Sequence, residues 1–478
     1  MKNFKSLFIL LLISFSIFSC FEDNDDTPIK SSSINDFVWK GMNLRYLYKS
    51  NIPDLADNRF ATDAQYQDYL TNAGTPEELF ESLIFERATV DRFSWIVDDY
   101  FELERQFQGT TGTNGMEFGL FASPNSTTEG FGVIRLVLPN SPADNMGLKR
   151  GDIFYGIDGN RLTNNNLPTL LGQDTYTLNL GIYNDNGTAD RADDSIDPIN
   201  RDVTLSKVQY TENPIFLNSI INVGGENVGY LMYNAFTRGS ENGLNTVFAD
   251  FASNNIQHLI IDLRYNPGGS VGTTTFLASM ITGQFNGDLF ERLIFNENFQ
   301  SDNRDLNFTN QLPNGSTINS VNLNKIYALT SSRSASASEG LINGLVPYID
   351  VIKIGDSTTG KTQLSRTLYD SPNFQRQGAN PNHTYAMQPL IGIGVNKNGE
   401  DVPGTGLVPS LGFEYVERPL DYGVLGDRNE PMLAIALADI EGSTTKLLDI
   451  TKSSQAKTFK LIKDSNDFIP NDGGMIID

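Results

Sequence analysis

The chain has 478 residues, with 35 basic and 58 acidic side chains and a formal net charge of −23 at pH 7. A chain of this length predicts about three domains rather than one compact core. The acidic balance argues against a nucleic-acid partner, because phosphate contacts need basic side chains that displace counterions.

The first residues predict an export signal. Lys2 and Lys5 supply positive charge, residues 7–18 are apolar, and Ser19-Cys20 closes the segment. This run is too short to span a bilayer. The chain's single cysteine falls at the cleavage point, in the tetrad IFSC, which resembles the lipobox of bacterial lipoproteins although Phe18 is bulkier than the usual residue. An ordinary secretory signal is the alternative interpretation.

Cys20 is therefore the predicted lipidation site, and its acyl chains would form an anchor in a membrane. We expect residues 1–19 to be a lipoprotein signal peptide and residues 20–33 to be a flexible, polar and acidic tether. The acidic residues after the cysteine resemble a surface-export signal of Bacteroidetes-type lipoproteins. These features predict an outer-membrane lipoprotein, on the periplasmic face or the cell surface.

Residues 34–108 are expected to form a small N-terminal helical domain whose role is packing. The string TPEE at residues 75–78 supplies an N-cap, a first-turn proline and a capping-box glutamate. Four apolar residues then recur on one helical face, which predicts that this face is buried. They are Leu79, Phe80, Leu83 and Ile84.

Residues 109–207 change to short alternating strands with turns, which predicts a β domain. Its glycine-flanked turn would expose successive backbone N–H groups, a geometry suited to binding a terminal carboxylate. The later string SPADNMGLKRGDIFYGIDG predicts a short helix, a strand and a hairpin, and the whole stretch resembles a PDZ domain of the bacterial protease type. The predicted carboxylate-binding residues are Gly115, Met116, Glu117, Phe118, Gly119 and Leu120.

Residues 208–418 predict a mixed α/β core. Residues 228–233 and 258–263 have the composition of buried strands, and residues 241–252 have helical periodicity. Asp262 and Arg264 precede the turn NPGG, and we expect them to form a structural ion pair that fixes it. Residues 419–478 predict a helix over 431–440 and a tail that packs against the core.

A run of small residues and serines, SASASE, follows the apolar stretch IYALT. This order places a hydroxyl at a strand-to-helix turn, where free backbone N–H groups can hold an oxyanion. Neither of the two histidines, His258 and His383, has a setting that suggests catalysis. A Ser-Lys arrangement is therefore the natural candidate, with Ser336 as nucleophile and Lys361, in the turn GDSTTGK, as its base.

The motifs DLRYNPGG, SASASEG and GDSTTGK occur in this order behind the PDZ-like segment, and together they resemble the C-terminal processing peptidases, or tail-specific proteases. The resemblance implies a crotonase-like core, a Ser336–Lys361 dyad, and an oxyanion hole from Ala337 and a glycine of Gly268-Gly269. Relatives usually carry a glutamine four residues after the lysine. Here that position is Ser365, and Gln363 is the candidate that orients the lysine.

The chemistry requires an unusual lysine. With a pKa near ~10.4, a lysine is neutral in well under about one molecule in a thousand at neutral pH. Burial would have to lower the pKa of Lys361 by about three units, which costs roughly 4 kcal/mol. We therefore expect Lys361 to lie in a dry pocket.

Two rival interpretations remain. The string GDSTTGKT also satisfies the nucleotide-binding P-loop pattern, but the residues after it predict a strand and a turn rather than a helix. The second rival is a catalytically inactive PDZ-type peptide-binding lipoprotein on a peptidase scaffold. We expect polypeptide substrates with free C-termini, and we expect no nucleotide, metal or other cofactor.

Overall fold

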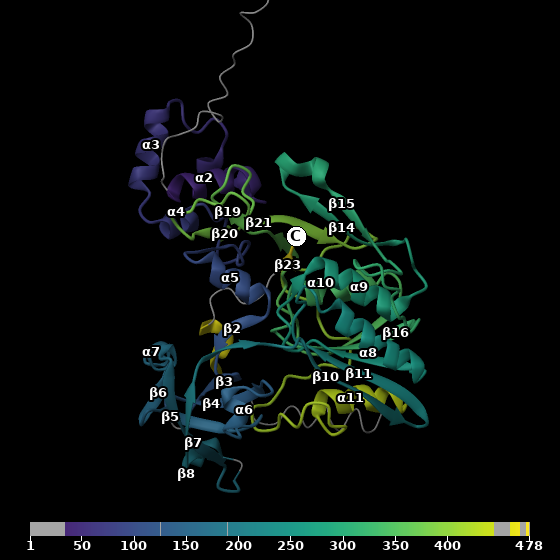
Figure 1. Cartoon of the computed structure of the whole chain (residues 1–478). Helices are drawn as coiled ribbons and strands as arrows, with labels where there is room; N and C mark the ends of the chain where they lie inside the picture. Colours follow the sequence, from purple (N-terminus) through teal and green to yellow (C-terminus); the bar gives the residue numbers. More distant parts are fainter. Residues whose placement is uncertain (1–33, 125, 189, 444–458, 469–474, 478) are drawn as a thin grey trace, which may run out of the picture.

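The computed structural model describes residues 34–124, 126–188, 190–443, 459–468 and 475–477 (Figure 1). The predicted signal peptide, the lipidation site Cys20 and the tether lie outside the described residues. Within these ranges, no helix has both the length and the apolar character needed to cross a membrane. The fold is mixed α/β, as predicted.

The amino-terminal part is mainly helical and lies at one end of the molecule (Figure 1). Thr75 caps α4 with a complete capping box, and Leu79, Phe80, Leu83 and Ile84 are buried, as predicted. Its elements are α2 (Ile34–Arg45), η2 (Lys49–Asn51), η3 (Pro53–Leu55), α3 (Asp63–Asn72), α4 (Pro76–Ser82), β1 (Trp95–Val97) and α5 (Tyr100–Phe107).

This part is not an independent helical domain. Its strand β1 pairs with β20 (Ala386–Gln388), which in turn pairs with β19 (Leu368–Tyr369). Leu368 and Met387 are fully part of its hydrophobic core. The predicted range 34–108 is therefore incomplete for this part, because strands β19 and β20, distant in the chain, also contribute to its core.

The second part is a β unit, which we define as residues 110–211; its strands form one two-stranded sheet and six of the seven strands of a larger sheet. Ser141 caps α6 and Asp158-Gly159 forms the predicted hairpin turn, with both φ angles positive, at 51° and 76°. Its elements are β2 (Thr110–Thr113), β3 (Met116–Ala122), β4 (Glu129–Val137), α6 (Pro142–Asn145), β5 (Ile153–Ile157), β6 (Asn160–Thr163), α7 (Leu167–Gly172), β7 (Thr175–Asn184), η4 (Arg191–Asp193), β8 (Ser195–Ser206) and β9 (Val208–Thr211).

The core contains a five-stranded sheet in the order β10-β11-β12-β16-β17, parallel except for β10. Alternate residues of each strand enter opposite layers: Leu231 packs under α8, α9 and α10, whereas Tyr230 packs under α11. The elements are β10 (Ile215–Val223), β11 (Glu226–Tyr233), α8 (Glu241–Ser253), β12 (His258–Asp262), α9 (Val271–Thr282), β16 (Lys325–Thr330), α10 (Ala337–Leu345), β17 (Asp350–Gly355) and α11 (Pro431–Ile440).

A second sheet has the order β13-β23-β18-β21-β14-β15 and carries the glycine turn and the lysine strand. Its strands are β13 (Gly269–Ser270), β14 (Leu289–Phe295), β15 (Arg304–Asn307), β18 (Gln363–Ser365), β21 (Leu390–Val395) and β23 (Met475–Ile476), with η5 (Glu297–Asp302) after β14. Because Lys361 leads into strand β18 and not into a helix, the P-loop alternative is excluded.

The carboxy-terminal residues do more than pack against the core. β23 lies between β13 and β18, while β22 (Leu461–Asp464), followed by η6 (Ser465–Phe468), joins the far edge of the β unit beside β3. Figure 1 shows this short yellow segment beside the blue strands of the β unit. The sequence prediction of a tail that packs against the core is therefore correct only for residues 475–477.

Candidate active site

Ser336 occupies a sharp turn between β16 and helix α10. Its φ of 61° and ψ of −112° lie in a region that non-glycine residues rarely adopt. Backbone strain of this kind costs about 1–3 kcal/mol and persists at sites where the surroundings enforce it. A strained strand-to-helix turn that presents a serine is the geometry of a nucleophile elbow.

The hydroxyls of the serine run differ in their partners. The Ser334 hydroxyl donates to the carbonyl of Leu263 at 2.8 Å, and the Ser338 hydroxyl donates to the carbonyl of Asn266 at 3.0 Å. The buried Ser336 hydroxyl has no hydrogen-bond partner among the described residues. Of the three, Ser336 is therefore the serine whose hydroxyl is available for chemistry, which supports the choice made from the sequence.

Lys361 is buried, with 2% of its surface exposed. Burial lowers the pKa of Lys361 from its usual value to about 8, and the carboxylates of Asp91 and Glu339 offset part of that effect. Its Nζ lies 5.0 Å from the ring centre of Phe93 and 5.6 Å from that of Trp95. The structure thus supplies the low-pKa lysine that the chemistry requires.

Glu339 holds the backbones of both candidate catalytic residues. Its Oε2 accepts the N–H of Ser336 at 2.7 Å and the N–H of Lys361 at 2.9 Å, so the two residues lie on either side of one oxygen atom. Its Oε1 accepts the N–H of Gly360 at 2.7 Å and the hydroxyl of Thr358. The sequence prediction missed this role, although the spacing S-x-x-E of a capping box is visible in the run.

No hydrogen bond joins the Ser336 hydroxyl to Lys361 in this arrangement, since that hydroxyl has no partner among the described residues. Catalytic hydrogen bonds are often long without substrate and tighten in the complex. Gln363 donates its amide N–H to the Tyr48 hydroxyl at 3.3 Å, and its Oε1 has no partner in the described part of the chain. Its predicted role in orienting Lys361 stays a prediction.

The amino-terminal part also contributes to this site. The Arg92 guanidinium donates to the carbonyls of Thr359, Gly360 and Gly404 at 3.1, 3.0 and 3.1 Å, which fixes the turn before Lys361. The predicted role of this part, packing alone, is therefore incomplete. No periodicity or motif around Arg92 marks such a role in the sequence.

The glycine turn lies against the serine turn. A Cβ atom added to Gly268 would lie 2.7 Å from Ser336 Cβ and 3.1 Å from the Ala337 nitrogen, so only glycine fits there. The Ala337 amide has no acceptor among the described residues, as expected for the first turn of a helix. The Gly268 amide, in contrast, donates to Asn266 Oδ1 at 2.9 Å. The predicted oxyanion role of Gly268, Gly269 and Ala337 stays a prediction.

Two clefts meet at Pro267, which lines both. One, of about 840 Å³, is lined by Lys361, Phe93, Trp95 and Arg333, together with Asp464. The other, of about 720 Å³, is lined by Gly268, Gly269 and Ser270, together with Ile476 and Ile477. Both cavities are thus bordered by Pro267, next to the glycine turn, and by carboxy-terminal residues.

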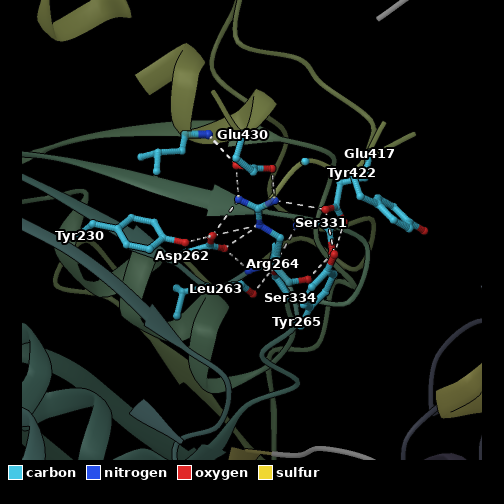
Figure 2. A network of polar contacts seen from close by, with 12 residues as sticks. Tyr230, Asp262, Leu263, Arg264, Tyr265, Ser331, Ser334, Glu417, Tyr422 and Glu430 are labelled. Atoms are coloured by element: carbon cyan, nitrogen blue, oxygen red, sulfur yellow. Dashed lines mark hydrogen bonds and ion pairs between the residues drawn. The ribbon is translucent and has the colours of Figure 1, made fainter. Parts of the chain in front are cut away.

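A buried ionic network anchors the strand end before the glycine turn (Figure 2). Arg264 pairs with Asp262 at 2.8 Å, which confirms the predicted ion pair, and with Glu430 at 2.6 Å. Glu417 binds both Arg264 and Arg150 of the β unit, and these cations outweigh burial and lower the pKa of Glu417 to about 2. The Ser331 hydroxyl donates to the Arg264 carbonyl, which ties the serine loop to the same network.

The predicted carboxylate-binding turn does not have the unpaired amides that we expected. The Gly115 amide donates to Thr113 Oγ1 at 3.0 Å and the Met116 amide to Asn114 Oδ1 at 3.2 Å. The Phe118 amide donates to Ser465 Oγ at 3.1 Å. Glu117, Gly119 and Leu120 belong to strand β3, which is paired with β4 and, in part, with β22.

Two protein-family models match parts of this chain. Residues 227–375 match the model of peptidase family S41, and residues 33–95 match that of the peptidase S41 N-terminal domain. The chain is 25% identical over 254 residues to carboxyl-terminal-processing peptidase 3, chloroplastic, of Arabidopsis thaliana, covering 52% of this chain and 45% of that protein. It is 24% identical over 313 residues to the carboxyl-terminal-processing protease of Picosynechococcus sp., covering 63% and 65% respectively.

The chain therefore spans between about half and two thirds of the length of these relatives. Among solved structures, it resembles an S41 protease from Bacteroides fragilis NCTC 9343, with a TM-score of 0.68 and 25% identity, over 85% of this chain and 97% of that one. The family match at residues 227–375 contains the glycine turn, the serine turn and Lys361. The chain thus carries a peptidase family S41 domain at residues 227–375, in agreement with the resemblance that its three motifs indicated.

Proposed function

We propose that this protein is a serine endopeptidase that cleaves exported polypeptides with a Ser336–Lys361 dyad. One observation carries the proposal: a strained, buried serine whose hydroxyl has no partner among the described residues shares one Glu339 oxygen with a buried lysine of pKa about 8. Both backbones are fixed by the same atom, which holds the two residues next to each other.

In the proposed reaction, the neutral Lys361 amine takes the proton of the Ser336 hydroxyl as the oxygen attacks the scissile carbonyl. The resulting ammonium returns the proton to the leaving amine, and water then hydrolyses the acyl-enzyme by the reverse sequence. The Ala337 amide and a glycine amide of Gly268-Gly269 would stabilise the oxyanion. Gly268 could take part only after its amide leaves Asn266 Oδ1.

The pH dependence tests this assignment. Because Lys361 acts as a base only when neutral, kcat/KM for an unfolded protein substrate should rise with pH and level off above about 8. Lys353→Gln, a half-buried lysine on β17, serves as the control and should keep the same profile. A rate that is flat from pH 6 to 9 contradicts the lysine base. Absence of turnover at every pH would favour the inactive peptide-binding alternative.

We further propose that the β unit is a PDZ-like domain that selects substrates by their C-termini, on a crotonase-like core. Antiparallel pairing along an edge strand is the way such domains hold an extended tail. An unfolded substrate with a free, apolar C-terminus should be degraded faster than the same chain amidated there. The difference should be in apparent KM, since the contact is remote from the chemistry. Equal rates would show that C-termini are not read.

Membrane attachment through Cys20 is the last part of the proposal. The motif IFSC supports lipidation, and an acyl anchor would place the enzyme at the outer membrane. Cys20→Ala should move the protein from the membrane to the soluble fraction after cell lysis and ultracentrifugation. Ser19→Ala, which keeps the cysteine, is the matched control. Cys20→Ala protein that still sediments with membranes would mean a different anchor.

A further inference from the structure

The edge of the β unit that would receive a substrate tail is occupied by the chain itself. Strand β22 pairs antiparallel with β3, with Leu461 opposite Phe121 and Asp464 opposite Gly119. The Ala122 amide donates to the Lys460 carbonyl at 3.1 Å, and the Phe118 amide donates to Ser465 Oγ. β22 therefore runs toward the start of β3, with its last residue opposite Gly119 and Ser465 beside Phe118. A substrate tail whose carboxylate reached the turn before β3 would run in the same direction.

Two arginines bind the end of this segment. Arg135, on β4, is buried and bonds Asp464 at 2.8 Å, Ser465 Oγ at 3.3 Å and Asn466 Oδ1 at 3.1 Å. Arg333, three residues before Ser336, donates its Nε to Asp464 Oδ2 at 2.7 Å. Burial alone would raise the pKa of Asp464. The two guanidinium groups outweigh the effect of burial and hold the pKa of Asp464 below its usual value.

The charges at this point require an anion. Glu117 Oε2, at 2.9 Å from Arg135, is the other carboxylate within bonding distance of these guanidinium groups among the described residues. If the segment that carries Asp464 left, the guanidinium groups of Arg135 and Arg333 would keep only the Glu117 carboxylate nearby. Arg135 Nε already has no hydrogen-bond partner in the described part of the chain. A buried charge without its partner is costly, so the vacated site would bind another carboxylate.

We propose that Arg135 and Arg333, at the start of the β3 edge, bind the terminal carboxylate of a substrate, and that residues 459–468 occupy this site until a substrate displaces them. This proposal rests on the proposed function for its substrate class, an extended polypeptide with a free C-terminus. It replaces the amides of the turn at Gly115 as the carboxylate receptor. It also places the incoming carboxylate in contact with the loop that carries Ser336.

The test is a binding measurement and needs no turnover. All proteins carry Ser336→Ala, and the probe is a fluorescein-labelled ten-residue peptide with a free C-terminal valine, followed by fluorescence polarisation. Asp464→Ala removes the internal carboxylate and should tighten Kd at least about tenfold, because the internal segment no longer competes well. The Kd of the amidated peptide should not tighten in Asp464→Ala. Lys460→Gln, an exposed side chain in the same segment, should bind like the parent.

Adding Arg333→Gln to Asp464→Ala should abolish the gain, since the incoming carboxylate loses one of its two cations. A Kd for Asp464→Ala that is unchanged or weaker, in protein with a cooperative thermal transition, overturns the proposal. These experiments measure binding and not turnover. The binding prediction can therefore fail while the peptidase assay succeeds, and the peptidase assay can fail while the binding prediction succeeds.

A second variant avoids weakening the fold. Ala122→Cys with Lys460→Cys, in a Cys20→Ser background, would pin the segment to β3 through a disulfide, because these two residues are joined by a backbone hydrogen bond. The oxidised protein should lose peptide binding, and reduction should restore it. Equal binding by the oxidised and reduced forms would show that the segment does not cover the peptide site.

Discussion

Ser336→Ala and Lys361→Ala are each expected to lower kcat/KM for peptide hydrolysis by at least about 10³-fold while the protein stays folded. In the proposed mechanism the Ser336 hydroxyl attacks while the Lys361 amine takes its proton, so loss of either group should stop the reaction. The double variant should therefore be no slower than the slower single variant, because losses within one catalytic unit do not add. Hydrolysis of a fluorogenic peptide under single-turnover conditions measures all three.

Ser338→Ala is the matched control in the same run of serines. The Ser338 hydroxyl already donates a hydrogen bond to the Asn266 carbonyl. The substitution should therefore lower stability slightly and leave most of the activity. Near-normal turnover by Ser336→Ala, or a loss in Ser338→Ala equal to that in Ser336→Ala, would contradict the assignment of the nucleophile. Far-ultraviolet circular dichroism of each variant separates lost chemistry from lost fold.

Arg264→Met should destabilise the protein by about 3–5 kcal/mol, because it leaves buried carboxylates without their cation. Arg264 is fully buried, and it bonds Asp262, Glu417 and Glu430 (Figure 2). The free energy of unfolding in urea at pH 7 measures the effect. The exposed pair Arg428–Glu441, at 3.7 Å, offers the control Arg428→Met, which should cost less than about 1 kcal/mol.

Arg264→Met should also change how the free energy of unfolding depends on pH in the acid range. The pKa of Glu417 is lowered to about 2, so its contribution is present above its unfolded pKa of roughly 4.3 and is lost as pH falls toward 2. In Arg264→Met this carboxylate keeps only Arg150 as its cation, and the loss of stability should begin at a higher pH. Equal stability of Arg264→Met and wild type at pH 7 would show that the network is not needed for folding.

The parts of the candidate site that could be proposed from the sequence are those that depend on local pattern. The proposed nucleophile, the proposed base and the glycine turn lie in short motifs, and the strands and helices around them follow hydrophobic periodicity and capping signals. The capping residues Thr75 and Ser141 and the helices α8 and α11 agree with the structure for this reason. Each of these features is decided by residues within one or two turns of chain.

The sequence could not predict contacts that join distant segments. Arg92 reaches carbonyls more than 260 residues away, and β22 pairs with a strand about 340 residues earlier. Such pairings depend on the assembled shape of the molecule, and a short strand such as β22 carries no periodic signal of its partner. The prediction of free amides at the turn failed in part for this reason, because the Phe118 amide binds Ser465, whereas the Gly115 and Met116 amides bind the nearby side chains of Thr113 and Asn114.

The two ends of the described chain both complete the catalytic centre. Phe93 and Trp95 lie beside the Lys361 ammonium, and Ile476 pairs with Ser270 and Ser365. During synthesis, the amino end emerges first and domains fold in that order. A partly emerged chain therefore has its nucleophile but lacks the last strand of the sheet around it. We therefore expect peptidase activity only once residues 475–477 have emerged and β23 has paired with β13 and β18.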